Sequence, residues 1–413
     1  KEKYDSFRQI EGKGRLLMPG WINAHMHLYS TFARGIALPS PPANFYEILS
    51  KLWWKLDSVL DWDAVYYSAL IPAITAVKKG VTAFIDHHAS ANAVDGSLDC
   101  IEEALALVGM RGILCYEVTD RYGKEVRINS LMENERYAKK CDENRGTNSN
   151  HLYDALVGLH ASFTLEDETL EEAATLQQSL QIGGHIHVLE DALDARLTHE
   201  KYKTSVVERL AEYQLLGEQT IAAHGIYLSA QEKDLLSDTD TIVVHNPQSN
   251  MNNAVGRTDI FGLLDRDILV GLGTDGMTPD VKVDARTANL LHKHDLKKPN
   301  IGWEEIQHML LKSNPEIYRR ISGRLIGKVE PGYLADLILV DYFPATPLTG
   351  DNFWGHFLFA IADAPVDTTI INGEIVMGNQ QLPHIDEAKI AVEAREVAEE
   401  VWQAFENHND VSL

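Results

Sequence analysis

Short apolar segments alternate with amphipathic segments along the first three quarters of the chain. Eight of the apolar segments contain many β-branched residues, and each ends in polar or ionisable positions. This pattern is typical of buried parallel strands. We predict the eight strands at residues 17–27, 81–88, 112–118, 155–160, 183–190, 220–224, 241–245 and 268–275.

Helical periodicity fills most of the intervals between these strands. The clearest helical segments are residues 52–79, 98–108, 166–180 and 205–216. Strands that alternate with helices predict an α/β fold, here a TIM-type (β/α)8 barrel. The chemistry of such barrels lies at the carboxyl ends of the strands. The ionisable residues of this chain fall at those ends, so we expect them to share one site.

The pattern changes after the eighth predicted strand. Residues 303–321 are predicted to be helical, and a strand is predicted at 335–340. The pair Asn372-Gly373 lies between two apolar segments, which is a strong hairpin signal. We therefore expect a barrel over residues 17–320, a small β-sandwich module from 1–16 and 321–380, and a C-terminal helix within 381–413.

The end of the first predicted strand carries His25 and His27. Side chains at positions i and i+2 of a strand point the same way, and two converging imidazoles suit a metal such as zinc. Such a pair can also be a surface or structural feature. The fifth strand adds His187 as a third metal nitrogen and Glu190 as a proton shuttle beyond the strand. His185 shares a face with His187, and we interpret it as filling the barrel interior.

The last three predicted strands end in His224, His245 and Asp275. His224 could orient a metal-bound water or complete the coordination sphere. His245 could contact substrate or only support its loop. Asp275 could ligate the metal and accept the proton of the attacking water, although a carboxylate after a strand can also cap the next helix.

Further candidates for substrate contact lie at the ends of the earlier strands. His160 follows the fourth strand and Arg34 follows the first. His87, His88 and Glu117 stand at the ends of the second and third strands. For each of them the alternative is support of the fold, such as an ion pair formed by Arg34.

Composition limits the classes of function. The 413 residues include 37 Lys and Arg against 61 Asp and Glu, a net charge of −24. This charge repels nucleic acid and anionic membranes, so we expect a small-molecule partner or another copy of the chain. No apolar run approaches the roughly 20 residues of a membrane span, and no signal peptide is visible. The three cysteines have no metal-type spacing, and we expect a cytoplasmic protein.

The strings PGWINAHMH, HVLE, AHG and GTDG, in this order, resemble the amidohydrolase superfamily in its deaminase and chlorohydrolase branch. IGKVEPGYLADLILVD and INGEIVM resemble the closing β module of that family, so the resemblance covers roughly residues 10–375. The longer strings LWWKLD, FIDHHAS and HNPQSNMNNAVG are similar to the SsnA group of aminohydrolases, which is associated with purine metabolism.

The resemblance implies one divalent metal ion held by His25, His27, His187 and Asp275. His224 would then position the hydroxide, and Glu190 would carry protons to the leaving nitrogen. Two-metal members of the family use a carboxylated lysine on the fourth strand, and residues 155–160 contain no lysine. We expect zinc, with iron or manganese as alternatives that the same ligands accept.

Two further expectations follow from the resemblance. Family members carry a longer stretch before His-x-His than the 24 residues present here, so either the sequence is trimmed or the β module is incomplete. Family precedent also favours a homo-oligomer, a dimer or larger.

We therefore expect an aminohydrolase that attacks a carbon–nitrogen bond of a purine-like nitrogen heterocycle. Hydrolytic ring opening and a catalytically silent metal-binding barrel are the alternatives. An editing deaminase of nucleic acid is disfavoured by the charge and by the lack of a His-x-Glu motif with Cys-x-x-Cys.

Overall fold

Two parallel sheets form the centre of the computed structural model, which describes residues 9–148 and 150–411. The strand orders are β2-β3-β4-β5 and β10-β9-β8-β7-β6. Single parallel bridges, Met26 to Asp275 and Val118 to Leu159, join the two sheets. The predicted parallel α/β arrangement is confirmed. The strands are β2 (Trp21–Met26), β3 (Val81–Asp86), β4 (Arg111–Leu114), β5 (Tyr153–Ala155), β6 (Val157–Ala161), β7 (Gly184–Val188), β8 (Ile221–His224), β9 (Ile242–His245) and β10 (Val270–Leu272).

Two of the predicted strands are each divided in the structure. The segment 17–27 splits at Gly20 into β1 (Leu16–Pro19) and β2, which belong to different sheets. A Cβ at Gly20 would lie 2.2 Å from the side chain of Thr82, so only glycine allows this close crossing. The segment 155–160 divides between β5 and β6, where the chain passes from one parallel sheet to the other.

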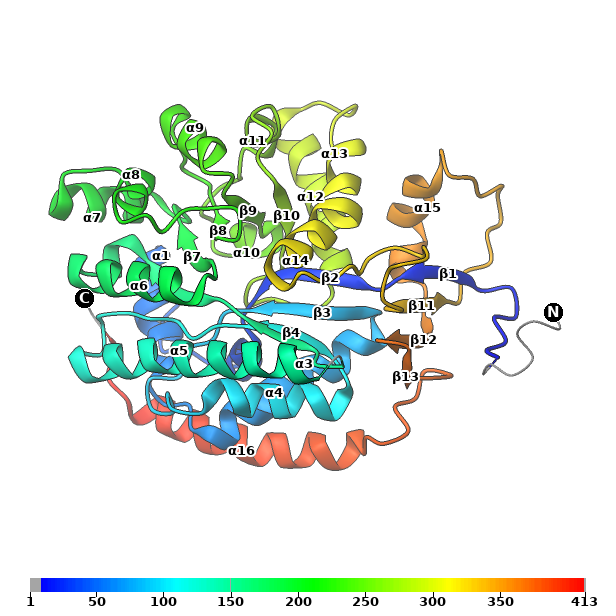
Figure 1. Ribbon diagram of the computed structural model, residues 1–413, viewed down its shortest axis with the longest axis horizontal. Helices are drawn as coiled ribbons and strands as arrows, with labels where there is room; N and C mark the ends of the chain where they lie inside the picture. The colour runs from blue at the N-terminus through cyan, green and yellow to red at the C-terminus, as the bar shows by residue number, and fades with distance from the viewer. Residues whose placement is uncertain (1–8, 149, 412–413) are drawn as a thin grey trace.

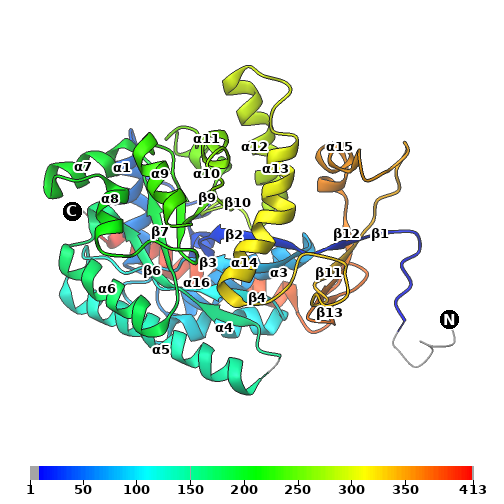
Figure 2. The ribbon, with the colours of Figure 1, turned by 45° about the horizontal axis from the view of Figure 1, so that its top comes forward.

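Helices surround the parallel sheets, as Figures 1 and 2 show. The predicted helix 52–79 is interrupted, because the side chain of Asp61 accepts a hydrogen bond from the Ala64 amide and starts a new helix. The helices are α1 (Phe45–Ile48), α2 (Trp54–Asp57), α3 (Trp62–Lys78), α4 (Ser97–Val108), α5 (Lys124–Thr147), α6 (Asp167–Leu180), α7 (Ala192–Tyr202), α8 (Val206–Glu212), α9 (Ala230–Asp238), α10 (Pro247–Asn252), α11 (Ile260–Leu264), α12 (Val281–Leu296), α13 (Glu304–His308), α14 (Asn314–Ser322), α15 (Phe353–Phe359) and α16 (Glu387–Asn407).

Short 3-10 and π-helical turns complete the helical structure. Two of them are π-helical, and each joins two α-helices. One of these π turns lies between α1 and α2, where it forms part of the pocket described below. The turns are η2 (Leu28–Ala33), η3 (Leu49–Trp53), η4 (Ser162–Thr164), η5 (Met309–Ser313) and η6 (Ile361–Asp363).

A smaller antiparallel sheet has the order β1-β11-β12-β13, with β11 (Leu337–Val340), β12 (Val366–Ile371) and β13 (Glu374–Met377). The predicted hairpin at Asn372-Gly373 is confirmed. The predicted β-sandwich is not confirmed, because the described residues form one sheet that packs against the end of α3. Residues 1–8 of the predicted module, and 412–413 of the predicted terminal segment, lie outside the described residues.

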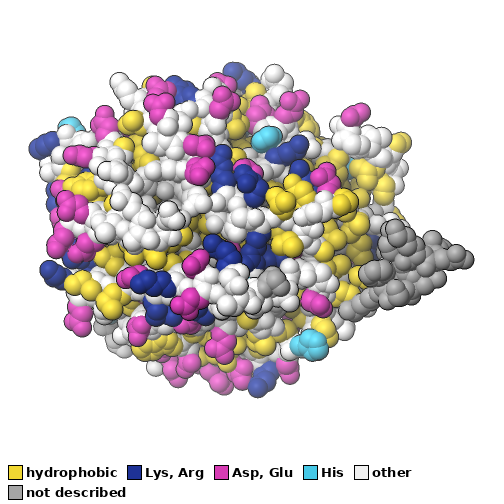
Figure 3. Space-filling view, viewed as in Figure 1, with side chains coloured by type: hydrophobic (Ala, Val, Ile, Leu, Met, Phe, Trp, Pro, Cys, Tyr) yellow, Lys and Arg dark blue, Asp and Glu magenta, His cyan; other side chains and the backbone are white. Residues whose placement is uncertain are grey.

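Helix α16 follows the small sheet and returns along the outside of α3 (Figure 1). The Trp402 indole donates a hydrogen bond of 2.8 Å to the Phe32 carbonyl, so the helix contacts the turn that follows the first strand of the parallel sheets. Acidic side chains are spread over the face shown in Figure 3. Within the described residues, no helix has the length and apolar character needed to cross a membrane.

Candidate active site

Four side chains converge where β2, β7 and β10 end. His25 and His27 come from β2 and the residue after it, His187 from β7, and Asp275 from the turn after β10. One ligand atom from each of the four lies within 4.8 Å of the others. The His27 Nε2 atom is 3.1 Å from His187 Nε2 and 3.0 Å from Asp275 Oδ1, and His25 Nε2 is 3.7 Å from the same oxygen.

Backbone carbonyls decide which imidazole nitrogens face the cluster. The Nδ1–H of His27 donates to the His87 carbonyl at 2.6 Å, and the Nδ1–H of His187 donates to the His160 carbonyl at 2.9 Å. When both rings are neutral, their Nε2 atoms therefore present lone pairs to each other, a contact that repels unless a proton or a metal ion lies between them. His25 Nε2 is also buried without a hydrogen-bond partner.

These observations fit a metal ion. Three imidazole nitrogens and one carboxylate oxygen form a donor set that zinc accepts, and carbonyl groups commonly orient metal-binding histidines in this way. His185 supports the cluster from behind, since its Nε2 lies 2.8 Å from His25 Nδ1. The interpretation of His185 as an interior residue agrees with its complete burial, and the structure adds its contact with His25.

The charges in the cluster favour a bound cation. Burial lowers the pKa of His25 to about 3 and that of His187 well below its ordinary value, so both imidazoles are neutral. Burial also lowers the pKa of His27, but the Asp275 carboxylate outweighs it and raises this pKa to about 9. A positive charge is thus stabilised between His27 and Asp275.

Glu190 and His224 lie beside this cluster. Glu190 Oε2 is 3.6 Å from His224 Nε2, which in turn is 4.0 Å from Asp275 Oδ2. The His224 Nδ1–H donates to Asn250 Oδ1 at 2.9 Å, so its Nε2 faces both carboxylates. Burial, reinforced by the charge of Asp275 and opposed by His224, raises the pKa of Glu190 to about 7.

The backbone is strained where these side chains are attached. His224 has a φ of 75°, Asp275 of 52°, and Leu189, which precedes Glu190, of 51°. Non-glycine residues in this left-handed region cost about 1–3 kcal/mol each, and such strain clusters at functional sites. A Cβ at Gly273 would lie 2.7 Å from the His25 carbonyl oxygen, so this glycine lets β10 approach β2 closely enough for Asp275 to join the histidines.

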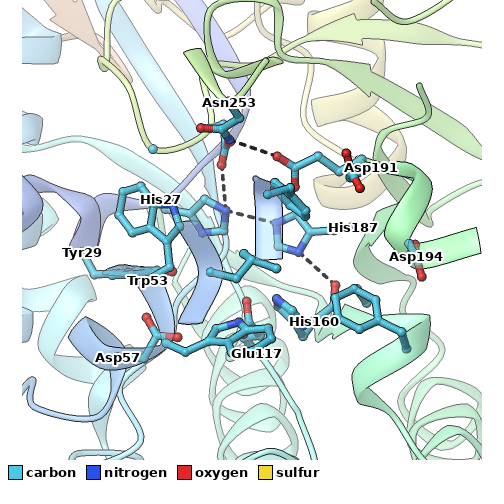
Figure 4. Close-up of a pocket in the computed structure, with 18 residues that line it drawn as sticks. His27, Tyr29, Trp53, Asp57, Glu117, His160, His187, Asp191, Asp194 and Asn253 are labelled. Atoms are coloured by element: carbon cyan, nitrogen blue, oxygen red, sulfur yellow. Dashed lines mark hydrogen bonds and ion pairs between the residues drawn. The ribbon is translucent and has the colours of Figure 1, made fainter. Parts of the chain in front are cut away.

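A pocket opens over the cluster. Figure 4 shows His27 and His187 facing each other, Asn253 and Asp191 toward one end, and Asp57 and Glu117 toward the other. The inner cavity encloses about 50 Å³, and a groove of about 1030 Å³ adjoins it. The inner cavity is lined by His27, Tyr29, Phe45, Leu49, Trp53, Trp54, Asp57, Glu117, His160, Ala161, Phe163, His187, Glu190, Asp191, Asp194, Asn253, Asp275 and Gly276.

A second acidic group stands at the end of the pocket away from Glu190. Glu117 accepts a hydrogen bond from Arg121 at 2.8 Å, and Arg121 is also 3.5 Å from Asp57 Oδ2. Burial and the nearby Glu117 charge raise the pKa of Asp57 to about 7, while Arg121 opposes them. Asp57 Oδ1 is buried without a hydrogen-bond partner, and Asp57 lines the pocket, so a hydrogen-bond acceptor is available there.

His87, Glu117 and His187 form another group with metal-ligand spacing. His87 Nδ1 is 3.4 Å from Glu117 Oε2, while its Nε2 faces the carbonyls of Leu159 and His185. His187 already directs Nδ1 to a carbonyl and Nε2 to the first cluster. The arrangement therefore fits a direct contact of His87 with Glu117 better than a second metal centre.

Only some of the residues predicted to contact substrate line the pocket. His160 and Glu117 line the pocket, and Thr164 Oγ1 lies 2.7 Å from His160 Nδ1. That hydroxyl donates to the Ala161 carbonyl, so the His160 ring donates at Nδ1 and leaves Nε2 as an acceptor. Burial, followed by the charge of Arg121, holds the pKa of His160 well below its ordinary value.

Arg34, His88 and His245 are not among the lining residues of the described pocket. Arg34 is exposed after η2, and His88 Nε2 is 2.8 Å from the Ser90 hydroxyl. His245 contacts Thr258 at 3.2 Å and His292 at 3.2 Å, which agrees with the alternative that it supports its loop. Their assignment to substrate binding stays a prediction without geometric support.

Several pocket residues were not predicted from the sequence. Trp53, Trp54 and Asp57 lie in the string LWWKLD, and Asn253 lies in HNPQSNMNNAVG. Both strings were noted for their resemblance to known proteins, but neither has a period that directs its side chains toward the site. The sequence signal that could have indicated these pocket residues was the pair of adjacent tryptophans close to an aspartate.

The chain is similar to proteins that are named as deaminases. A 5'-deoxyadenosine deaminase from Methanobrevibacter smithii is 31% identical over 409 residues, which cover 96% of this chain and 88% of the relative. A 5-methylthioadenosine/S-adenosylhomocysteine deaminase from Syntrophomonas wolfei is 29% identical over 396 residues, which cover 94% of this chain and 88% of the relative.

Two solved structures share the fold. An adenosine deaminase from Xanthomonas campestris with bound zinc has a TM-score of 0.80 at 22% identity, with 94% of this chain and 86% of that chain covered. The zinc complex of the atrazine chlorohydrolase TrzN from Arthrobacter aurescens has a TM-score of 0.79 at 18% identity, with 96% and 91% covered. The family model described as "Amidohydrolase family" matches residues 16–376. The predicted hydrolase class is confirmed at this level: the chain belongs to the amidohydrolase family.

Proposed function

We propose that this protein is a metal-dependent aminohydrolase that releases ammonia from a purine-like heterocycle, with an adenosine-like nucleoside as the substrate class. The observation that carries the proposal is the convergence of His25, His27, His187 and Asp275 beside Glu190 and His224. Relatives named as deaminases of adenosine derivatives, at 29–31% identity over nearly the whole chain, support the substrate class.

The four converging side chains would hold one divalent ion, and we propose zinc. The solved structures of similar fold that carry zinc support this choice. We also propose that the two parallel sheets form one closed barrel, which the bridges at Met26 and Val118 support. The barrel would begin at β2 and run to residue 320, with β1 and residues 321–380 as a separate small module.

The side chains around the cluster divide the proton transfers. A divalent ion bound there would make hydroxide available near neutral pH, since it lowers the pKa of water from about 15.7 towards about 7. Asp275 accepts the proton of the attacking water, and His224 Nε2 accepts a hydrogen bond from it. Glu190 gives its proton to the ring nitrogen next to the reacting carbon. The water proton held by Asp275 then passes to Glu190 and on to the departing amine, and the C–N bond breaks to release ammonia. The remaining proton of the new hydroxyl group returns Glu190 to its acid form as the carbonyl bond forms.

The charge of the pocket favours a neutral substrate. Six of the lining side chains are carboxyl groups, and none of the described lining residues is Lys or Arg. Arg121 lies behind the wall of the pocket, where it forms ion pairs with Glu117 and Asp57. A phosphate in this pocket would meet carboxylates without a cationic partner, so nucleotides should be poor substrates. The lining acids are Asp57, Glu117, Glu190, Asp191, Asp194 and Asp275.

The test is ammonia release from matched compounds by the zinc-loaded protein. Adenosine, 5'-deoxyadenosine and adenosine 5'-monophosphate would be compared with guanine, pterins and partly reduced purines, and products would be weighed by mass spectrometry. We expect ammonia from the nucleosides and a much lower kcat/KM for the monophosphate. Product that gains water without losing ammonia would instead establish ring opening, and no turnover of any purine would contradict the proposal.

A further inference from the structure

One short helix contacts all three groups that the proposed function assigns to proton transfer. Helix α10 follows β9, and Pro247 occupies its first turn. The Ser249 hydroxyl donates to Asp275 Oδ2, and Asn250 Oδ1 accepts from His224. Asn253, which ends the helix, donates from Nδ2 to Glu190 Oε1 at 3.2 Å. These contacts are independent of the metal cluster on the other side of the same groups.

The direction of these hydrogen bonds follows from their neighbours. An ionised Glu190 can only accept, so the Asn253 amino group faces Oε1, and Asn253 Oδ1 is left to accept from Asn252 at 3.1 Å. Its two hydrogens then go to Glu190 Oε1 and to Ser249 Oγ, the latter at 3.3 Å. Ser249 has one hydrogen, which it gives to Asp275. Asn253 therefore lies between the two carboxylates, and each carboxylate has one oxygen occupied as an acceptor.

The other oxygen of each carboxylate faces the reaction. Glu190 Oε2 lies 3.6 Å from His224 Nε2, and Asp275 Oδ1 lies 3.0 Å from His27 Nε2. When Glu190 is a neutral acid, the oxygen that accepts from an amide N–H is the carbonyl-type oxygen, because the protonated oxygen is the weaker acceptor. The acid proton then belongs on Oε2, which points toward the attacking water and the leaving nitrogen.

We propose that Asn253 is a positioning residue that selects the proton-carrying oxygen of Glu190 and, through Ser249, the orientation of Asp275. The inference rests on the proposed function. In each turnover the proton from the broken water O–H bond passes from Asp275 to Glu190 Oε2, and it forms the new N–H bond on the leaving nitrogen as the C–N bond breaks. Without the Asn253 amino group, the Glu190 carboxyl group would be free to rotate or to carry its proton on Oε1, away from the substrate.

A purely structural role for Asn253 makes different predictions. Its backbone N–H donates to the Ser249 carbonyl at 2.8 Å and closes the end of α10. If this cap were its whole contribution, an isosteric side chain would preserve activity. Loss of the helix end would lower the stability, the metal content and the substrate affinity together. It would not lower kcat alone.

The test uses Asn253→Asp, which keeps the shape and replaces the amino group with an acceptor. Because misplacement of a reacting group by about 1 Å can cost about 10²-fold, we expect kcat to fall by about that factor. KM, melting temperature and zinc content should stay near wild type, and the solvent isotope effect on kcat should rise as proton transfer becomes limiting. Asn253→Gln, which retains the amide, should recover part of kcat.

Met251→Ala is the matched control, since Met251 is 52% exposed on the same helix and is not among the residues that line the described pocket. A kcat within twofold of wild type in Asn253→Asp would overturn the inference. So would a kcat loss that runs in parallel with zinc loss or a lower melting temperature.

Infrared spectroscopy gives a readout that does not depend on turnover. The C=O band of protonated Glu190 is identified by its loss in Glu190→Gln. In Asn253→Ala this band should move to higher frequency, because its hydrogen bond is gone; an unmoved band would overturn the inference. If the wild-type protein released no ammonia from any purine, the proposed function would fail, while the infrared result would still decide whether Asn253 holds Glu190.

Discussion

The two walls of the pocket are built in different ways. The wall that carries His25, His187 and Asp275 is made of strand ends, and backbone carbonyls or buried side chains hold its functional groups. The opposite wall comes from α1, η3 and α2, which are helical segments of four or five residues each. In the proposed function the strand wall would supply the reaction chemistry, and the helical wall would supply the surface against which the substrate is selected.

The helical wall depends on a distant part of the chain. Val411, close to the C-terminus, packs in the same apolar cluster as Phe45 and Leu49, and its N–H donates to the Ser50 carbonyl at 3.3 Å. The Lys55 ammonium lies 4.6 Å from the centre of the Phe405 ring in α16. The inner cavity of about 50 Å³ lies against this wall, next to the groove of about 1030 Å³.

The largest effect should come from the strand wall. Glu190→Gln removes the acid that protonates the leaving nitrogen, and a general acid of this kind contributes about 10²–10⁴ in rate. We expect kcat to fall by that range while zinc content is unchanged, as measured by ammonia release and elemental analysis. Glu168→Gln, on the exposed start of α6, is the control. Near-normal activity in Glu190→Gln would contradict the role assigned to this residue.

The helical wall should affect KM more than kcat. In Asp57→Asn the amide oxygen would turn toward Arg121, so the amino group would replace the free acceptor Oδ1 in the pocket. A hydrogen bond to a charged group contributes about 1.5–3 kcal/mol, so we expect KM for a nucleoside to rise by about tenfold or more.

Steady-state kinetics with adenosine measure this change, and Asp63→Asn, on the exposed side of α3, is the control. A fall in kcat as large as the rise in KM, or a fall in KM, would contradict the proposed division between the two walls.

The strand wall should also set the pH dependence. Burial first, and then the charge of Asp275, raises the pKa of Glu190 to about 7. The reaction needs Glu190 in its protonated form, so kcat/KM should decline above about pH 7, by about tenfold for each further unit. A pH profile from 5 to 9 measures this limb. Rates that continue to increase above pH 8 would show that the acid form is not required.

The smallest effect is expected from the C-terminal segment. Removal of residues 408–413 takes away the hydrogen bond to Ser50 and the packing of Val411 on the helical wall. Because one such hydrogen bond contributes about 0.5–1.5 kcal/mol, KM should rise about two- to tenfold with kcat nearly unchanged. The single variant Val411→Ala should show a smaller change in the same direction, and a fall in kcat alone would be unexpected.

The difference between the walls also explains what could be predicted from the sequence. The strand wall follows a simple rule: residues at i and i+2 share a face, and parallel strands present their carboxyl ends together. His25, His27 and His187 could therefore be placed from their order in the chain. Asp275 was placed in the same way, although its left-handed backbone and the close approach at Gly273 were not visible.

The helical wall follows no such rule. Residues 44–57 have apolar positions typical of a continuous helix, but the chain forms two short helices around a π turn. Asn253 was visible only as one of several asparagines, and its role depends on the direction of hydrogen bonds formed in three dimensions. Helix α5 was missed for a related reason, because its sequence is polar throughout and lacks an apolar stripe.

Anomalous diffraction from crystals of the zinc-loaded protein tests the central claim most directly. The claim predicts one anomalous peak about 2.0–2.2 Å from the facing nitrogens of His25, His27 and His187 and from a carboxylate oxygen of Asp275. Crystals of Asp275→Asn grown in the same way should show a weaker peak or none. A wild-type protein without this peak, or with its peak at His87 and Glu117 instead, would contradict the account.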